Sequence, residues 1–155
     1  MRFQGTVTIR AARQKIWDFM TNAEAVASCA PGLESLEVQE PCKRFRAVGT
    51  VALGSVKQRF STSVEWTDLE KPRRASMKFC GTAPGSAVNG KTSMTLSDGA
   101  GGATELTWEA DLAVVGTLAA VAARLMDGVV RKLTAEFFER LQKKIESRKD
   151  SRGRR

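Results

Sequence analysis

Few side chains in this sequence have the chemistry and spacing of a catalytic site. There is no His among the 155 residues, and His is the side chain most often used for proton transfer near neutral pH and for binding zinc or iron. A His-based triad and a two-His metal site are therefore excluded. The best-placed carboxylates, Glu65, Glu105, Glu109 and Asp111, alternate with apolar residues in strand-like segments. This alternation predicts that they face solvent and form no inward-facing acid–base pair.

Neither the cysteines nor the glycine-rich segment indicates a reactive site. Cys29, Cys42 and Cys80 are odd in number and lack a C-x-x-C spacing, which favours free thiols in a reducing cytosol. Residues 81–90 are rich in Gly but lack the Lys-Ser/Thr ending and the following helix of a phosphate-binding loop. We interpret this segment as a flexible loop at the rim of a binding site. The sequence predicts no metal site and no built-in cofactor.

Four polar residues fall on strand positions that otherwise carry apolar side chains: Gln58, Thr62, Thr92 and Thr104. They either form local hydrogen bonds inside an apolar interior or orient the head group of a ligand, as the few polar groups of a binding site usually do.

Asp127 and Gly128 interrupt a segment with helical periodicity. Gly inside a helix costs about 1 kcal/mol relative to Ala, so we expect Gly128 to permit close packing of the helix on its neighbour, with Asp127 exposed. If the protein were an enzyme, Gln58 or Asp127 would have to be the catalytic group.

The periodicity of apolar residues predicts the elements that position these side chains. Period-two alternation indicates strands, and steps of three and four indicate helices. Residues 117 to about 147 follow the helical pattern and predict an amphipathic helix of about 30 residues. Before it, the sequence predicts a strand at 3–9, short helices at 12–20 and 22–29 with Asn22 as N-cap, and strands near 44–51, 56–66, 75–79, 92–96 and 106–112.

This order of elements predicts an α+β helix-grip fold of the Bet v 1/START type. A curved antiparallel sheet of about seven strands has one apolar face, and only the long C-terminal helix can cover it. Two short helices follow the first strand. We expect one ligand-binding domain at 1–146 and a disordered basic tail at 147–155.

A curved sheet need not touch the covering helix along its whole length, which leaves room for a ligand. Small residues such as Ala119 and Ala122 occupy the first half of the long helix, whereas bulky ones such as Leu133 and Phe137 occupy the second. We therefore expect a void beside the first half. The predicted ligand-binding residues are Phe60, Thr62, Met77, Phe79, Met94, Leu106, Trp108, Leu118, Val121, Ala122 and Leu125.

The apolar and charged segments of the sequence predict a cytoplasmic protein with a basic C-terminal end. The N-terminus lacks the apolar stretch of a signal peptide, and the longest apolar segment, 112–130, is interrupted by charged residues. Residues 143–155 hold seven basic and two acidic side chains out of a total net charge of +8. The basic residues either only keep the chain in solution or make weak electrostatic contact with an anionic surface, which is the inner face of a membrane or an acidic patch on a partner. No aromatic residue lies among these basic ones, so nucleic-acid binding is not predicted.

Three sequence features together resemble the G-subunit family of carbon monoxide dehydrogenase, within the START/Bet v 1-like (SRPBCC) superfamily. They are Phe3-x-Gly5, the run Cys29-Ala30-Pro31-Gly32, and the helical segment from Leu118-Ala119-Ala120 through Arg124-Leu125-Met126-Asp127-Gly128 to Phe137-Phe138-Glu139-Arg140-Leu141. The resemblance covers residues 1 to about 142. It implies the helix-grip fold, an apolar cavity and an accessory role.

That accessory role, as the resemblance implies it, is to recruit a carbon monoxide dehydrogenase-type molybdenum hydroxylase to the cytoplasmic membrane and to handle a hydrophobic electron carrier such as a quinone. We therefore predict a non-catalytic accessory protein that binds an apolar small molecule, a lipid or a quinone. The alternative is a polyketide cyclase- or hydrolase-like enzyme of the same superfamily. The sequence leaves open whether the protein forms a homodimer.

Overall fold

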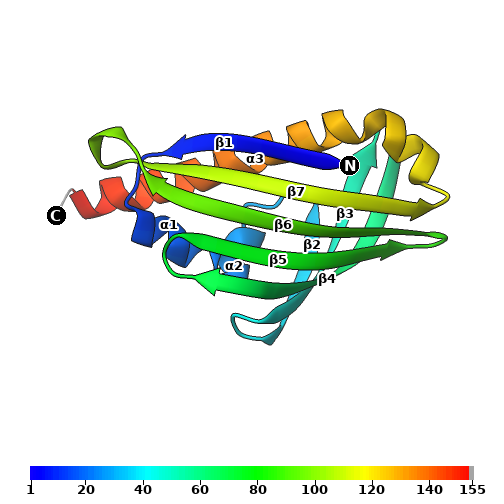
Figure 1. Ribbon diagram of the computed structural model, residues 1–155, viewed down its shortest axis with the longest axis horizontal. Coiled ribbons are helices and arrows are strands. Elements are labelled where there is room, and N and C mark those ends of the chain that lie inside the picture. The colour runs from blue at the N-terminus through cyan, green and yellow to red at the C-terminus, as the bar shows by residue number, and fades with distance from the viewer. Residues whose placement is uncertain (154–155) are drawn as a thin grey trace.

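The computed structural model describes the backbone of residues 1–153 and the side chains of residues 1–145. Seven strands form one antiparallel sheet in the order β1-β7-β6-β5-β4-β3-β2 (Figure 1). The strands are β1 (Arg2–Ile9), β2 (Leu33–Glu40), β3 (Arg44–Leu53), β4 (Val56–Glu70), β5 (Arg74–Ala83), β6 (Ser86–Asp98) and β7 (Thr104–Gly116). The helices are α1 (Arg13–Met20), α2 (Ala23–Ala27), the short 3-10 helix η1 (Ala100–Gly102) and α3 (Ala119–Gly153).

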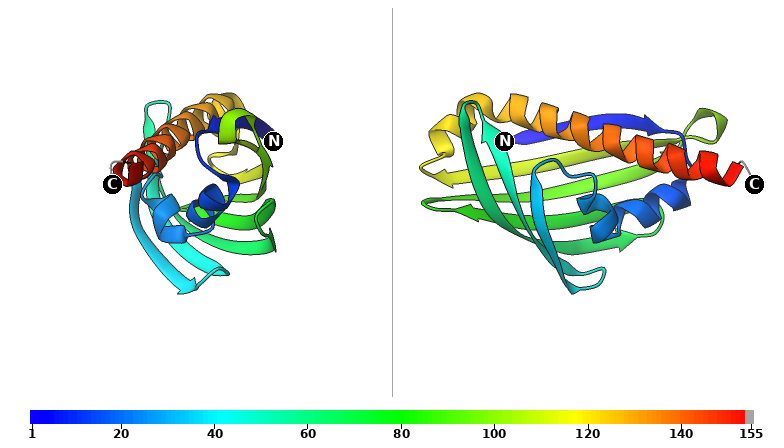
Figure 2. Two further views of the ribbon diagram at one scale, coloured as in Figure 1. Left: turned by 90° about the vertical axis from the view of Figure 1, so that its left-hand side faces the viewer. Right: turned by 180° about the vertical axis from the view of Figure 1, so that it is seen from behind.

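The sheet curls around α3, and α1 and α2 lie against the same side of the sheet near the C-terminal half of α3 (Figure 2). Period-two alternation turns one face of each strand toward the helix, because successive side chains of a strand point to opposite faces. The predicted α+β helix-grip architecture, with about seven strands and two short helices after the first strand, is confirmed.

The tightly packed core lies at the end of the molecule where α1 and α2 meet α3. From α1, Ile16, Trp17 and Phe19 are buried against Leu141 and Ile145 of α3. Residues of β1, β5, β6 and β7, together with Cys29 after α2, complete this cluster. The two short helices therefore fill the space between the sheet and the second half of α3. This placement decides where the ligand cavity lies.

Some local predictions are confirmed and others are wrong. Asn22 caps α2 as predicted, since its Oδ1 accepts hydrogen bonds from the backbone N–H groups of Glu24 and Ala25 at 3.0 and 3.2 Å. Residues 81–90, however, form no flexible loop: β5 and β6 continue through them as a hairpin closed at Pro84-Gly85, and Gly85 has a φ of +76°. Strand β2 has no counterpart among the predicted elements.

Gly128 does not pack closely against any neighbour. A Cβ built at Gly128 has no atom within 4 Å among the described residues, so the predicted close approach of helix and sheet at this point is wrong. Asp127 is exposed as expected and forms an ion pair with Arg131, one turn later in α3.

The boundary between domain and tail was predicted at residue 147. Helix α3 does not end there but continues to Gly153. Residues 154 and 155 and the side chains from 146 onward lie outside the described part of the chain. The disorder of the tail stays a prediction.

Candidate ligand-binding site

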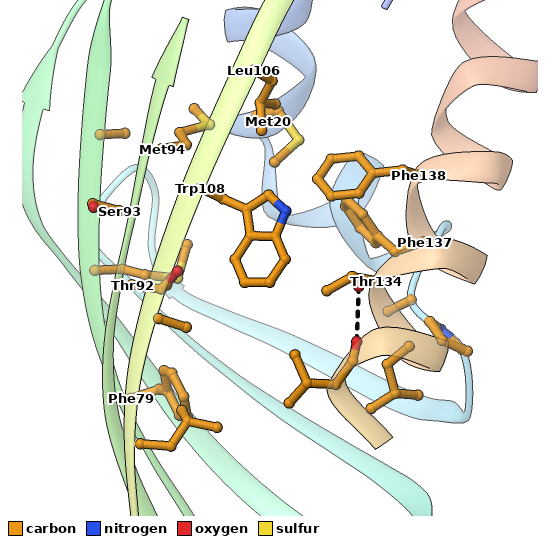
Figure 3. A pocket seen from close by; sticks show the side chains of 18 of the residues that line it. Met20, Phe79, Thr92, Ser93, Met94, Leu106, Trp108, Thr134, Phe137 and Phe138 are labelled. Carbon is orange, nitrogen blue, oxygen red and sulfur yellow. Dashed lines mark hydrogen bonds between the residues drawn. The ribbon is translucent and has the colours of Figure 1, made fainter. Parts of the chain in front are cut away.

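A cavity of about 450 Å³ lies between the inner face of the sheet and the second half of α3 (Figure 3). Its volume is within the range of small-molecule sites, roughly 300–1,000 Å³. The sheet supplies one wall, α3 the opposite wall, and α1 with the α2–β2 connection closes one side. The lining residues are Met20, Ala30, Pro31, Trp66, Ala75, Met77, Phe79, Thr92, Ser93, Met94, Leu106, Trp108, Ala110, Leu112, Val130, Leu133, Thr134, Phe137 and Phe138.

A second cavity of about 230 Å³ continues from the first toward the N-terminal end of α3. The two cavities have four lining residues in common: Phe79, Leu112, Val130 and Leu133. These four side chains form the boundary between them. Together the two cavities follow α3 from residue 118, just before its start, to residue 138.

Trp108 projects from β7 into the larger cavity toward Phe137 and Phe138 of α3 (Figure 3). Its position depends on Gly5, the directly opposite residue on β1. A Cβ at Gly5 would lie 2.7–2.9 Å from three atoms of the indole ring, closer than non-bonded atoms can approach. Only Gly at this position lets the indole lie across β1.

Gly90 has the same role for Phe79 and Leu112. It lies on β6 directly between these two residues of β5 and β7. A Cβ at Gly90 would lie 2.5 Å from Phe79 Cζ and 2.8 Å from Leu112 Cδ2. The missing side chain thus makes room for the two side chains that separate the cavities.

The cavity walls carry almost no available polar groups. The hydroxyl of Thr92 donates to the carbonyl of Glu109 at 2.8 Å, and that of Thr134 donates to the carbonyl of Val130 at 2.8 Å. Within the described residues, the indole N–H groups of Trp66 and Trp108 and the hydroxyl of Thr62 have no hydrogen-bond partner. They remain free to bind an acceptor atom of a ligand.

No Lys, Arg, Asp or Glu is among the residues that line either cavity in the described part of the chain. Because an unpaired charge is very costly in such surroundings, the site suits a neutral molecule. Larger hollows exist on the outer face of the sheet. One of about 600 Å³ is bordered by Glu65, Lys78 and Lys91 and faces solvent, so it lacks the apolar enclosure of the inner site.

The sequence model of the CoxG family, the G subunits of carbon monoxide dehydrogenase, matches residues 5–146. The chain belongs to this family. The family assignment that the resemblance predicted is therefore confirmed over these residues, which include the Cys29–Gly32 run and the helical segment after Leu118. No curated protein sequence matches the chain.

Solved structures share the fold at low sequence identity. A conserved protein from Geobacillus kaustophilus is 23% identical with a TM-score of 0.87, over 95% of this chain and 96% of that chain. Zhui aromatase/cyclase from Streptomyces sp. R1128 is 16% identical with a TM-score of 0.73, over 96% and 94% of the two chains. Protein Ms6760 from Mycobacterium smegmatis is 13% identical with a TM-score of 0.69, over 94% and 91%. At these identities the likeness shows the fold alone.

Most of the eleven residues predicted to bind ligand lie at the walls of the two cavities. Met77, Phe79, Met94, Leu106 and Trp108 line the larger cavity of this CoxG-family protein. Phe60, Thr62, Phe79, Leu118 and Ala122 line the smaller one. The remaining two, Val121 and Leu125, lie at neither wall. Leu125 instead borders a surface groove beside the β3–β4 turn, close to Gly54.

A void lies beside the first half of α3, as expected, but it is the smaller of the two cavities. The larger cavity, beside the bulky half of α3, was not predicted. The reason is the wedge formed by α1 and α2. It holds the second half of α3 away from the sheet, and Phe137 and Phe138 cover only part of the gap, with their rings edge to face at a centroid distance of 5.2 Å. The prediction missed this Phe pair as well as Trp66 and Met20, although the helical spacing of the two Phe residues after Leu133 marks the face turned toward the sheet.

The two residues considered as catalytic candidates, Gln58 and Asp127, lie away from the cavities, as does Thr104. Gln58 Nε2 donates to the carbonyl of Arg59 at 3.3 Å, and Asp127 is paired with Arg131 on the exposed side of α3. Thr104 is fully buried and donates to the carbonyl of Ala11 at 2.7 Å, so it ties β7 to the segment before α1. None of the three is among the lining residues.

Among the residues that the structure describes, no helix is both long and apolar enough to cross a membrane.

Proposed function

We propose that this protein is a non-catalytic accessory protein that holds a neutral apolar molecule of the lipid or quinone class between α3 and the sheet. The observation that carries the proposal is the cavity of about 450 Å³ with its uncharged lining. A cavity of this size would be filled by side chains if its only purpose were stability, because unfilled volume in a core is destabilising.

The unpaired N–H groups of the lining indicate which polar groups a ligand can carry. The indole N–H groups of Trp66 and Trp108 can bind a carbonyl or ether oxygen, whereas a carboxylate would need a cation that the lining lacks. We therefore favour a quinone or a neutral lipid over a free fatty acid. Each N–H bond to a carbonyl contributes about 0.5–1.5 kcal/mol, so burial of the apolar body supplies most of the affinity.

Membership of the CoxG family supports the choice of partner. We propose that the protein associates with a carbon monoxide dehydrogenase-type molybdenum hydroxylase at the cytoplasmic membrane, where it hands the apolar molecule between enzyme and bilayer. Purification of the tagged chain from its native cells should bring down molybdenum in a fixed ratio to the protein. Purified complexes without molybdenum would contradict this pairing.

Native mass spectrometry of the full chain, purified without detergent, tests the ligand proposal. We expect a mass increment that disappears on organic extraction, together with a neutral lipid or quinone in the extract. A chain that carries nothing and takes up neither a quinone nor a neutral lipid would contradict the proposal.

The enzymatic alternative is supported only by a shared fold with proteins such as the aromatase/cyclase. Its two candidate groups, Gln58 and Asp127, lie outside the cavity walls. The test is to assay the purified protein for hydrolysis or cyclisation. An activity that is lost in Gln58→Ala or Asp127→Ala would favour this alternative over the accessory role.

A further inference from the structure

Three connections gather at one end of the molecule, opposite to the C-terminal end of α3 (Figures 1 and 2). They are the β3–β4 turn, the β5–β6 turn and the β7–α3 junction, which we call the turn end (residues 53–57, 83–87 and 113–124). Hydrogen bonds tie two of them together: Thr117 N–H donates to the carbonyl of Gly85 at 3.0 Å, and the hydroxyls of Ser86 and Thr117 are 2.9 Å apart. The third contacts α3, because Gly54 lies next to Leu125. These contacts hold the three connections of the turn end together as one surface.

The turn end exposes apolar side chains. Val115 is 53% exposed and Val56 is 49% exposed, the two highest values among the large apolar residues in the described part of the chain. Pro84, Ala113 and Ala120 are exposed around them. Leaving such groups in water is unfavourable, which makes this end a candidate contact surface.

The charged side chains of the turn end are all basic. Residues 50–58, 81–90 and 112–126 contain no Asp or Glu. Lys57 and Arg124 are exposed there, and neither forms a salt bridge in the described structure. The opposite end carries charges of both signs, with Asp68, Glu70 and Asp98 near Lys71, Arg73, Arg74 and Arg13. Exposed apolar groups with basic ones and no acidic ones match the surface of an anionic bilayer, whose headgroups attract cations while its interior accepts apolar side chains.

The smaller cavity lies directly behind the turn end. Leu53 and Leu118, at the end of β3 and just before the start of α3, line it together with Val88 and Val114. An apolar molecule that leaves a bilayer beneath the turn end would therefore reach the cavity after passing few side chains.

We propose that the turn end docks on an anionic lipid bilayer and is the end through which the cavity exchanges its ligand with the membrane. The docking is argued from the exposed apolar and basic side chains of the turn end. The exchange of ligand with the membrane rests on the proposed function. The contact is shallow and reversible, since a few apolar side chains and two cations contribute far less than a membrane-spanning helix.

The test is sedimentation of the full chain with vesicles of phosphatidylcholine and phosphatidylglycerol. Val56→Glu with Val115→Glu places charge at the two exposed apolar positions and should weaken partitioning about tenfold or more, because each methylene withdrawn from the bilayer costs about 0.8 kcal/mol. The matched control is Val38→Glu with Leu69→Glu, which changes two apolar residues exposed by 38% and 40% elsewhere on the sheet. The control should bind as the unmodified chain does.

A second pair of variants tests the electrostatic part. Lys57→Gln with Arg124→Gln should weaken binding at about 0.1 M NaCl and have little effect at about 1 M, where the Debye length falls from about 10 Å to about 3 Å. Equal partitioning of the Val56/Val115 variant and the unmodified chain would overturn the docking proposal, as would an equal loss in the Val38/Leu69 control.

Uptake of the neutral probe menadione without vesicles separates this proposal from the proposed function. The Val56/Val115 variant should bind menadione normally, because the larger cavity is intact. If the unmodified chain binds vesicles through the turn end but takes up no menadione, docking is supported and the ligand proposal fails. If it takes up menadione and the variant still binds vesicles equally well, docking alone is overturned.

Discussion

At the residue scale, the cavity depends on glycines that face large side chains across neighbouring strands. Gly5 faces Trp108, and Gly90 lies between Phe79 and Leu112. In each case the missing Cβ leaves the space that an aromatic ring or Leu occupies. Gly in a strand often marks such a close approach. Gly5 thus has a direct structural role, since it leaves the space for the indole that projects into the site.

Gly5→Ala should therefore destabilise the protein. The new Cβ would lie 2.7–2.9 Å from the Trp108 ring, so the indole must shift, at a cost typical of overpacking, about 1–3 kcal/mol. Urea unfolding measures the stability, and near-UV circular dichroism reports the displaced indole. The control is Gly128→Ala, where a Cβ meets open space within α3; it should stabilise by about 0.5–1 kcal/mol. Equal effects of the two substitutions would contradict this account of Gly5.

Trp108→Phe tests the free indole N–H as a ligand contact. The substitution keeps an aromatic ring in the cavity but removes the donor. Binding of menadione, which has two carbonyl oxygens, should weaken by about 0.5–1.5 kcal/mol. Binding of 2-methylnaphthalene, which has no acceptor, should change less. Isothermal titration of both probes with both proteins measures the difference, and an equal loss for the two probes would show that Trp108 contributes only apolar surface.

At the element scale, α3 lines both cavities, with the small Ala122 beside the smaller one and the bulky Phe137 and Phe138 beside the larger. Ala122 is 1% exposed and lines the smaller cavity. Ala122→Phe should fill existing space and change stability by no more than about 1 kcal/mol. It should weaken binding of a naphthoquinone with an isoprenoid tail more than binding of menadione, because only the tail needs the smaller cavity. A loss of several kcal/mol with neither ligand affected would show a packed core at this position.

The elements themselves were largely predictable from the sequence because most of them are amphipathic. Strands such as β4 and β7 alternate apolar and polar residues, and α3 has a long apolar stripe. Strand β2 was missed because its buried positions do not alternate: it is an edge strand, paired only with β3. The 81–90 hairpin was missed because its Gly and small polar residues resemble a loop, although one of them, Gly90, makes room for Phe79 and Leu112.

The site was less predictable than the fold because its position depends on contacts between elements distant in the sequence. Side-chain size along α3 predicted the smaller cavity but not the larger one beside the bulky half. The wedge of Ile16, Trp17 and Phe19 under Leu141 sets the separation of helix and sheet, and no local pattern encodes that separation. Inward-facing strand residues such as Met94 and Trp108 were found because alternation fixes their side of the sheet.

At the scale of the whole molecule, the turn end and the basic tail are on opposite ends of α3. The helix spans 35 residues, roughly 50 Å at about 1.5 Å per residue. The two ends therefore cannot both lie at the same point of a flat bilayer. The proposed membrane contacts of the tail and of the turn end are therefore at different places on the molecule, and their dependence on salt can be tested one by one.

Removal of residues 147–155 should weaken binding to anionic vesicles at low salt and leave binding at about 1 M NaCl unchanged. Each basic residue near a charged membrane contributes about 1 kcal/mol, and this contribution is screened within a Debye length. Vesicle sedimentation at low and high salt, with and without the tail, measures the difference. Equal binding of the two chains at low salt would remove the tail from the membrane contact.

The central claim, that the space between α3 and the sheet holds a neutral apolar molecule, is tested most directly by filling the larger cavity. Ala110 lines its wall on β7, between Trp108 and Leu112. Titration of the full chain and of Ala110→Phe with menadione, with urea unfolding of both proteins, gives affinity and stability together. We predict that Ala110→Phe abolishes binding while stability changes by no more than about 1 kcal/mol. Menadione binding that is the same in Ala110→Phe and in the unmodified chain would contradict the account. So would an unmodified chain that binds no menadione together with a variant that is several kcal/mol less stable.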